Sequence, residues 1–294
     1  MKIGVIPASG IGDGLLMQIA VHHLQKLHFE VITFSNPLLE LKDWFPSATI
    51  LPKVGSIDTY LSFDLLILQN DNTPFSKQIR KLPLPVYTLF RSYEPDKQGP
   101  PTDRDIIFER STSFADQISD KIQALFPIEA PSKENGITPP SHLTYKKYPK
   151  RVVIHPFSTS FHKNWKESSY LKLKLKLLKL GWDPVLIAPP NTQQKWESPS
   201  LTSLSDLASF LYESAYFIGN DSGPGHLASN LKIPTLTIGE NFEHLSFWRP
   251  GWHRGSLAYL PQIFSNFKLI RKNWKSFITL NKVTKRFTEL SGIK

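Results

Sequence analysis

Residues 2–14 read KIGVIPASGIGDG, a short apolar strand that runs into a turn with three glycines. Apolar residues then recur at helical spacing from Leu15 to Leu27, and strand-like runs follow at 29–34 and 63–68. Short apolar runs that alternate with a helix are typical of buried parallel strands covered by helices. The opening of the chain therefore predicts an α/β fold built on a parallel sheet.

The alternation restarts in the second half, after a stretch at 127–150 that is rich in proline and polar residues. The elements expected there are strands at 151–154, 184–188, 216–218 and 234–238 and helices at 168–180 and 205–213. Two consecutive open α/β domains fit this pattern, with residues 1–145 in the first and 146–265 in the second. A cleft between such domains is the expected place for a ligand.

Residues 266–294 close the chain with eight lysine and arginine residues against one glutamate. Apolar residues lie among them, and we expect a basic amphipathic helix. Two interpretations stay open: a terminal helix with one solvated face, and a contact with an anionic membrane. A return of this helix to the first domain is a further option.

The amino-acid composition excludes several classes of protein and of functional site. The 294 residues are 40% hydrophobic, which suits packed cores and not global disorder. The absence of cysteine excludes disulfides, thiolate metal sites and cysteine nucleophiles. The net charge of +10 indicates an anionic partner, whether a phosphorylated substrate, a phospholipid or a nucleic acid. No signal peptide and no membrane-spanning run of about 20 apolar residues is evident, so we expect a cytoplasmic protein.

The turn after the first strand places Gly10, Gly12 and Gly14 where a helix begins, and backbone N–H groups at such a point favour an anion or a polar substrate. The pattern misses the dinucleotide fingerprint G-x-G-x-x-G because position 15 is leucine. Asp13 lies in the same turn. The sequence alone leaves open whether Asp13 is the helix N-cap or part of a site.

A second segment, 154–165, follows the strand that opens the second half. It supplies the hydroxyls of Ser158, Thr159 and Ser160 and the ammonium of Lys163, which are groups that hold phosphate. A solvated loop is the alternative interpretation.

The third segment, 217–231, is the most informative. A strand ends at Asp221, Ser222 and Gly223, and Pro224 stands where the first turn of a helix accepts proline. The free N–H groups and dipole of that helix would bind a diphosphate, and His226 would add a hydrogen bond or a charge. A capped helix with a chance histidine is the alternative. The D-x-D pattern at 103–105 precedes a strand and is interpreted as a coincidence.

In this order and at this spacing, the three segments resemble glycosyltransferase family 9, the heptosyltransferases of lipopolysaccharide core assembly. The resemblance rests on Gly10-Ile11-Gly12-Asp13, His155-Pro156 with Lys163-Asn164-Trp165, and 219–228. It implies the GT-B fold, with two Rossmann-like domains facing across a cleft, the acceptor on the first and a nucleotide-sugar on the second. Phe157 and Gly239-Glu240 depart from the family pattern.

The resemblance also implies roles for the site residues. Asp13 matches the catalytic base and Lys163 the phosphate-binding lysine. The substrate-binding positions that it implies are Gly10, Gly12, Ser158, Thr159, Asp221, Ser222, Gly223, Pro224 and His226. The implied reaction is an inverting transfer, without metal or cofactor, from a nucleoside-diphosphate sugar such as ADP-heptose to a lipopolysaccharide core or related glycan. It implies a place in the cytoplasm, with peripheral contact at the inner face of the inner membrane left open.

Three other functions stay open. A nicotinamide-dependent oxidoreductase shares the glycine-bearing βαβ start. A nucleic-acid-binding module would suit the charge of +10 but lacks an evident helix-turn-helix or aromatic-studded groove. A family member without activity would act as a binding protein.

Overall fold

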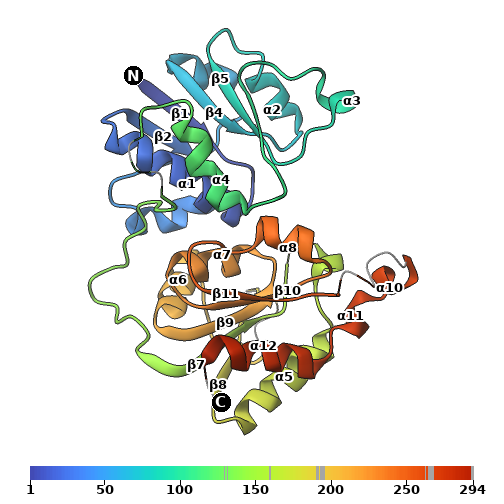
Figure 1. Cartoon of the computed structure of the whole chain (residues 1–294). Coiled ribbons are helices and arrows are strands. Elements are labelled where there is room, and N and C mark those ends of the chain that lie inside the picture. Colours follow the sequence, from blue (N-terminus) through green and yellow to red (C-terminus); the bar gives the residue numbers. More distant parts are fainter. Residues whose placement is uncertain are drawn as a thin grey trace. The chain divides into compact units, whose positions relative to one another are not determined.

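The computed structural model describes residues 1–128, 130, 132–158, 160–189, 192, 196–261, 263 and 268–292 (Figure 1). The chain forms two compact units, Met1–Thr138 and Pro139–Lys294. Each unit carries one parallel sheet with helices on its faces, so the α/β class predicted from the sequence is confirmed.

The sheet of the first unit has six strands in the order β3-β2-β1-β4-β5-β6, all parallel. The strands are β1 (Lys2–Ile6), β2 (Glu30–Phe34), β3 (Thr49–Leu51), β4 (Leu65–Gln69), β5 (Val86–Phe90) and β6 (Asp105–Ile107). The helices are α1 (Ile11–Lys26), η1 (Pro37–Trp44), η2 (Ile57–Ser62), α2 (Pro74–Ile79), α3 (Pro95–Gln98) and α4 (Phe114–Gln123). Strand β4 is buried along its whole length, as expected for a central strand with both faces covered.

The order of these strands reverses between β1 and β4. Strands β2 and β3 continue the sheet on one side of β1, whereas β4, β5 and β6 extend it on the other. Connections that leave neighbouring strands in opposite directions open a crevice at the carboxyl ends of those strands. The turn after β1 and the residues after β4 meet at this switch point.

The sheet of the second unit has five parallel strands in the order β11-β10-β9-β7-β8. The strands are β7 (Tyr148–His155), β8 (Asp183–Leu186), β9 (Ser214–Asn220), β10 (Thr235–Ile238) and β11 (Gly255–Ala258). The helices are η3 (Phe161–Lys163), α5 (Glu167–Lys179), α6 (Leu204–Tyr212), α7 (Gly223–Asn230), α8 (Phe242–Trp248), α10 (Lys268–Lys272), α11 (Trp274–Phe277) and α12 (Leu280–Ser291). Its switch point lies between β7 and β9.

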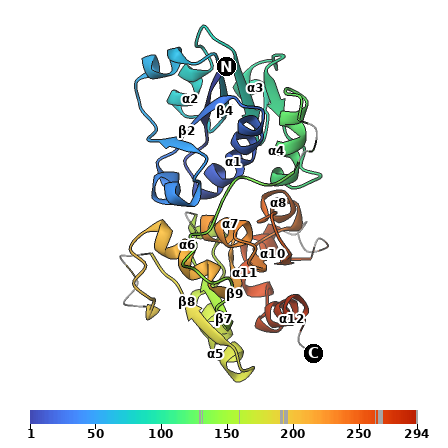
Figure 2. The same ribbon diagram turned by 90° about the vertical axis from the view of Figure 1, so that its left-hand side faces the viewer.

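Helices α5 and α12 lie together on one face of this sheet, and α6 and α7 lie on the other (Figures 1 and 2). The face under α5 and α12 is a continuous apolar core that includes Tyr170, Leu177, Val283 and Phe287. Burial of these side chains is the main force that holds both helices to the sheet.

The basic C-terminal segment contributes to the core of the second unit. Helix α12 packs against β10, β11 and α5. Trp274, Ile278 and Phe287 are buried there, while Leu269 and Phe277 stay exposed. The apolar face of the basic segment is therefore largely used in the core. Within the described ranges, no helix is both long enough and apolar enough to span a membrane.

Candidate functional site

Asp13 lies at the switch point of the first sheet, in the first turn of α1. Gln69, the last residue of β4, donates a 2.7 Å hydrogen bond from Nε2 to Asp13 Oδ1. The same glutamine accepts a 3.0 Å hydrogen bond from the amide of Ala8 through Oε1, which fixes its orientation. Arg91 places a guanidinium nitrogen 3.4 Å from Asp13 Oδ1. The carboxylate is thus held by one neutral and one cationic donor and keeps 17% of its side-chain surface exposed.

The N-cap interpretation of Asp13 is wrong. Gly10 is the N-cap of α1, with no side-chain cap bond, and Asp13 is the third helical residue. A Cβ on Gly10 would lie 2.7 Å from Asp13 Oδ2, so this glycine leaves the space into which the carboxylate folds. Gly12 is buried at the second position of the helix.

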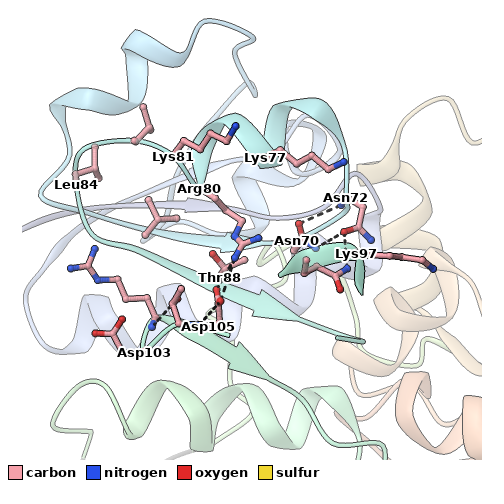
Figure 3. Close-up of a pocket in the computed structure, with 15 residues that line it drawn as sticks. Asn70, Asn72, Lys77, Arg80, Lys81, Leu84, Thr88, Lys97, Asp103 and Asp105 are labelled. Atoms are coloured by element: carbon pink, nitrogen blue, oxygen red, sulfur yellow. Dashed lines mark hydrogen bonds and ion pairs between the residues drawn. The ribbon is translucent and has the colours of Figure 1, made fainter. Parts of the chain in front are cut away.

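A basic pocket with a volume of about 610 Å³ opens beside β5 and β6 of the same unit (Figure 3). Its cations come from α2 and the two residues after it, from α3 and from the approach to β6. They are Lys77, Arg80, Lys81, Lys97 and Arg104. Leu82, Leu84 and Val86 add an apolar wall, and Asn70, directly after Gln69, lies at one end. Such a pocket suits an anionic ligand that also carries apolar groups.

The D-x-D pattern lies at the rim of this basic pocket. Arg80 Nη2 donates to Oδ1 and Oδ2 of Asp105 at 3.2 and 3.3 Å, and the amide of Thr102 donates to Asp105 Oδ2. Its side chain is only 2% exposed. The second aspartate of the pattern, Asp105, is therefore engaged in an ion pair with Arg80.

At the switch point of the second sheet, three side chains converge on the carboxylate of Asp221. Lys163 Nζ lies 2.9 Å from Asp221 Oδ2, and His244 Nε2 lies 3.2 Å from the same oxygen. His226 Nε2 is 3.7 Å from Oδ1. The sequence predicted Lys163, Asp221 and His226 as site residues, and the structure brings all three together.

The electrostatics keep Asp221 ionised. Burial alone would raise the pKa of Asp221, but the polar contacts with His226 and His244 and the charge of Lys163 outweigh it and hold the pKa well below its usual range. Lys163 remains 43% exposed while Asp221 is 10% exposed. The lysine can therefore reach a ligand from solvent, whereas the carboxylate is a fixed buried anchor.

The start of α7 adds backbone donors to this cluster. Gly223 and Pro224 open the helix, and Ser222 precedes it as an N-cap whose side chain makes no capping bond in the described structure. The Ser222 hydroxyl instead lies 3.3 Å from His155 Nδ1 at the end of β7. Burial lowers the pKa of His155 to about 4, so this ring is neutral at pH 7. The early amides of α7, which the Ser222 side chain does not cap, suit an anion.

The loop that carries Lys163 is tied to the sheet by Asn220, the last residue of β9. Asn220 Nδ2 donates to the carbonyl of Pro156 at 2.9 Å, and Oδ1 accepts from the amide of Trp165 and the hydroxyl of Tyr170 at 3.0 and 2.8 Å. These hydrogen bonds of Asn220 hold both ends of the loop between β7 and α5 in place. Lys163 is thereby positioned by a buried network.

The sequence predicted that the hydroxyls of Ser158 and Thr159 contact phosphate, and the structure describes only the first of them. Ser158 Oγ lies 2.7 Å from the Ser160 carbonyl and 2.6 Å from Asn164 Oδ1, so its hydrogen is already used within the loop. Thr159 lies outside the described residues.

Five of the residues around these carboxylates were not predicted as site residues, although two of them, His155 and Asn220, lie in the segments that carry the resemblance. The five are Gln69, Arg91, His155, Asn220 and His244. Most of them are brought in by strand pairing or by contacts that cross many residues, which no local pattern reveals. His244 has a local signal, because Asn241 caps α8 by accepting the amide of His244 and thereby sets it in the first turn. Within the described ranges, no group of three or more His, Asp or Glu side chains is arranged to hold a metal ion.

The chain is similar to a known protein family over part of its length. The family described as "Glycosyltransferase family 9 (heptosyltransferase)" matches residues 109–250, a range that contains Lys163, Asp221, His226 and His244. Lipopolysaccharide heptosyltransferase 3 of Escherichia coli strain K12 is 28% identical over 114 residues, which are 34% of this chain and 33% of that protein. The matched part thus spans about a third of the length of this curated relative.

Solved structures share the fold over nearly the whole chain. A glycosyl transferase family 9 protein from Veillonella parvula superposes with a TM-score of 0.71 at 18% identity and covers 100% of this chain and 98% of its own. The Escherichia coli heptosyltransferase WaaC with ADP-2-deoxy-2-fluoro heptose gives a TM-score of 0.69 at 14% identity, covering 98% and 99%. The family match and the curated relative thus show that residues 109–250 are similar to glycosyltransferase family 9, and the solved structures show that the whole chain shares the fold of these proteins.

Proposed function

We propose that this protein transfers a sugar from a nucleoside-diphosphate donor to a lipopolysaccharide core or related glycan, with ADP-heptose as the donor. The observation that carries the proposal is the Lys163–Asp221 pair at the uncapped start of α7, in the part of the chain that the family matches. The relatives named as heptosyltransferases, one of them solved with an ADP-heptose analogue, support the choice of donor. Nothing in the comparisons favours an oxidoreductase.

In this proposal the second unit binds the diphosphate. Lys163 supplies the charge, and the first amides of α7 supply hydrogen bonds directed along the helix dipole. Asp221 orients Lys163 and His244 so that neither has to be ordered when the donor binds. As the sugar leaves, negative charge grows on the diphosphate and these preorganised donors stabilise it.

Asp13 would act as the general base. An inverting transfer needs one carboxylate to accept the proton of the attacking hydroxyl, with an expected contribution of about 10² to 10⁴-fold. Gln69 would position the carboxylate through its 2.7 Å hydrogen bond. Lys163 and the α7 amides would take the part that a divalent metal plays in other transferases, so the reaction would need no metal.

The acceptor would bind to the first unit through its anionic groups. The basic pocket offers Lys77, Lys81 and Arg104, which have no acidic partner among the described residues, as candidate contacts. A lipid-linked acceptor would place the reaction at the cytoplasmic face of the inner membrane. Replacing Lys77 and Lys81 together with glutamine should raise the acceptor KM and leave ADP binding unchanged.

The donor can be tested directly by calorimetric titration with ADP, UDP and GDP, followed by a transfer assay with ADP-heptose and lipopolysaccharide core in EDTA. We expect ADP to bind most tightly and ADP to be released only when acceptor is present. Preference for another nucleotide would overturn the donor assignment, and loss of transfer in EDTA with rescue by Mg²⁺ would overturn metal independence.

A further inference from the structure

Helix α5 has two apolar faces, and only one of them is buried in the core of the second unit. Tyr170, Leu173 and Leu177 are fully buried in the core of the second unit. Leu171, Leu175 and Leu178 are 44%, 59% and 49% exposed. Their spacing of four and three residues puts them in one row along the outside of the helix, since successive residues turn by about 100°.

A row of lysines runs beside this row of leucines. Lys172, Lys176 and Lys179 have the same spacing, one residue further along, and all three are exposed. None has an acidic partner among the described residues. In contrast, Lys174, on the other side of the leucines, is paired with Glu197 at 3.3 Å. We call the outer surface made by these three leucines and three lysines the leucine–lysine face.

Adjacent rows of leucine and unpaired lysine are the pattern of a helix that lies in the interface of a membrane. The leucines enter the boundary of the acyl chains while the ammonium groups meet anionic headgroups. A second copy of the chain would bring like charges together, which opposes self-association through this face. The basic C-terminal segment is a weaker candidate, because Trp274, Ile278 and Phe287 are buried in the core.

We propose that the leucine–lysine face of α5 docks the protein on an anionic lipid bilayer. The occupant follows from charge complementarity: the lysines need an anionic surface, and the leucines need one with an apolar interior. The proposal goes beyond glycosyl transfer and does not depend on the donor or the acceptor. It assigns membrane contact to α5 and not to the basic tail considered from the sequence.

The test is cosedimentation of the full chain with vesicles of phosphatidylglycerol and phosphatidylethanolamine, compared with vesicles of phosphatidylcholine. The triple variant Leu171→Gln, Leu175→Gln, Leu178→Gln removes the apolar row. Its matched control replaces three exposed leucines elsewhere, Leu51, Leu61 and Leu269. The triple variant Lys172→Gln, Lys176→Gln, Lys179→Gln removes the charges, and replacement of Lys42, Lys150 and Lys272 is its control.

We expect the parent to prefer anionic vesicles. The lysine variant should lower the partition coefficient on the order of 100-fold, since each lysine near an anionic surface contributes about fivefold. The leucine variant should lower it at least about tenfold, and both controls should bind like the parent. Because the replaced side chains are exposed, circular dichroism and ADP titration should match the parent, which separates failure of docking from failure of the proposed transferase function.

Three results would overturn the proposal. The first is parent-like binding by the leucine variant. The second is a parent that sediments as a dimer without lipid and becomes monomeric in the leucine variant, which would make the face an interface between copies. The third is a parent that ignores anionic vesicles but binds polyglutamate through the lysine row, which would indicate an acidic protein as the partner.

Discussion

Gln69 donates from Nε2 to Asp13 Oδ1 at 2.7 Å, joining the end of β4 to the first turn of α1 across the switch point of the first sheet. The glutamine is itself held by the amide of Ala8. Two residues 56 positions apart in the chain thus form one unit, with an amide that directs a carboxylate. The proposed base is therefore oriented by the sheet itself.

Replacing Gln69 with leucine should slow transfer without weakening donor binding. The variant removes the hydrogen bond that aims Asp13, and we expect kcat to fall about tenfold, in line with a hydrogen bond to a charged group. Initial rates and ADP titration measure the two effects. An unchanged kcat would mean that Gln69 does not position the carboxylate.

Replacing Lys163 with glutamine should weaken ADP binding. Loss of an ammonium that meets the diphosphate should raise the Kd by about 10 to 100-fold. Lys147→Gln, which removes an exposed lysine that lies 3.8 Å from Glu213, is the control and should bind ADP like the parent. Equal affinity in both variants would place the diphosphate elsewhere.

Replacing Asn220 with alanine should destabilise the second unit. Asn220 is buried and satisfies the Pro156 carbonyl, the Trp165 amide and the Tyr170 hydroxyl. We expect the free energy of unfolding to drop by about 2 to 4 kcal/mol, because buried polar groups lose their partners. Urea denaturation measures the change, with the exposed Asn273→Ala as control, and a loss no larger than that of the control would refute the role of this network.

The free energy of unfolding should fall as the pH is lowered, because His155 is buried in its neutral form. Its pKa is lowered to about 4 in the folded state, against about 6.5 for an unperturbed histidine. As the pH falls from 7 to 4, this histidine is protonated in the unfolded chain but stays largely neutral in the folded chain. His155 alone therefore lowers the free energy of unfolding by about 3 kcal/mol between pH 7 and 4. The lowered pKa of Asp221 acts in the same direction at more acidic pH.

Urea denaturation at several pH values tests the contribution of His155. His155→Gln should have a shallower dependence between pH 7 and 4, whereas replacing the exposed His142 should not change it. A parent and a His155 variant with identical slopes would contradict the assignment.

The sequence was most informative where structure is local. The apolar runs predicted β1, β2, β4 and β7–β10 to within a few residues, because buried parallel strands are continuous and end at polar turns. Pro224 correctly marked the start of α7. The strand expected after the D-x-D pattern corresponds to β6. In contrast, β3 and β11 are only three and four residues long and were not expected, because segments so short carry little pattern.

The site was predicted only in part, for a related reason. Lys163, Asp221 and His226 lie in segments with recognisable turn chemistry, and they converge. Gln69 and Arg91 reach Asp13 only because strands far apart in sequence are neighbours in the first sheet. The N-cap alternative for Asp13 failed because Gly10 takes that position and a partner on another strand engages the carboxylate.

The most direct measurement is the rate of sugar transfer by Asp13→Asn at saturating donor. Asparagine keeps the shape and the contact with Gln69 but cannot accept the proton. We expect a fall of about 10² to 10⁴-fold in kcat, with ADP binding as in the parent. A variant that is folded and transfers at close to the parent's rate would show that Asp13 is not the general base.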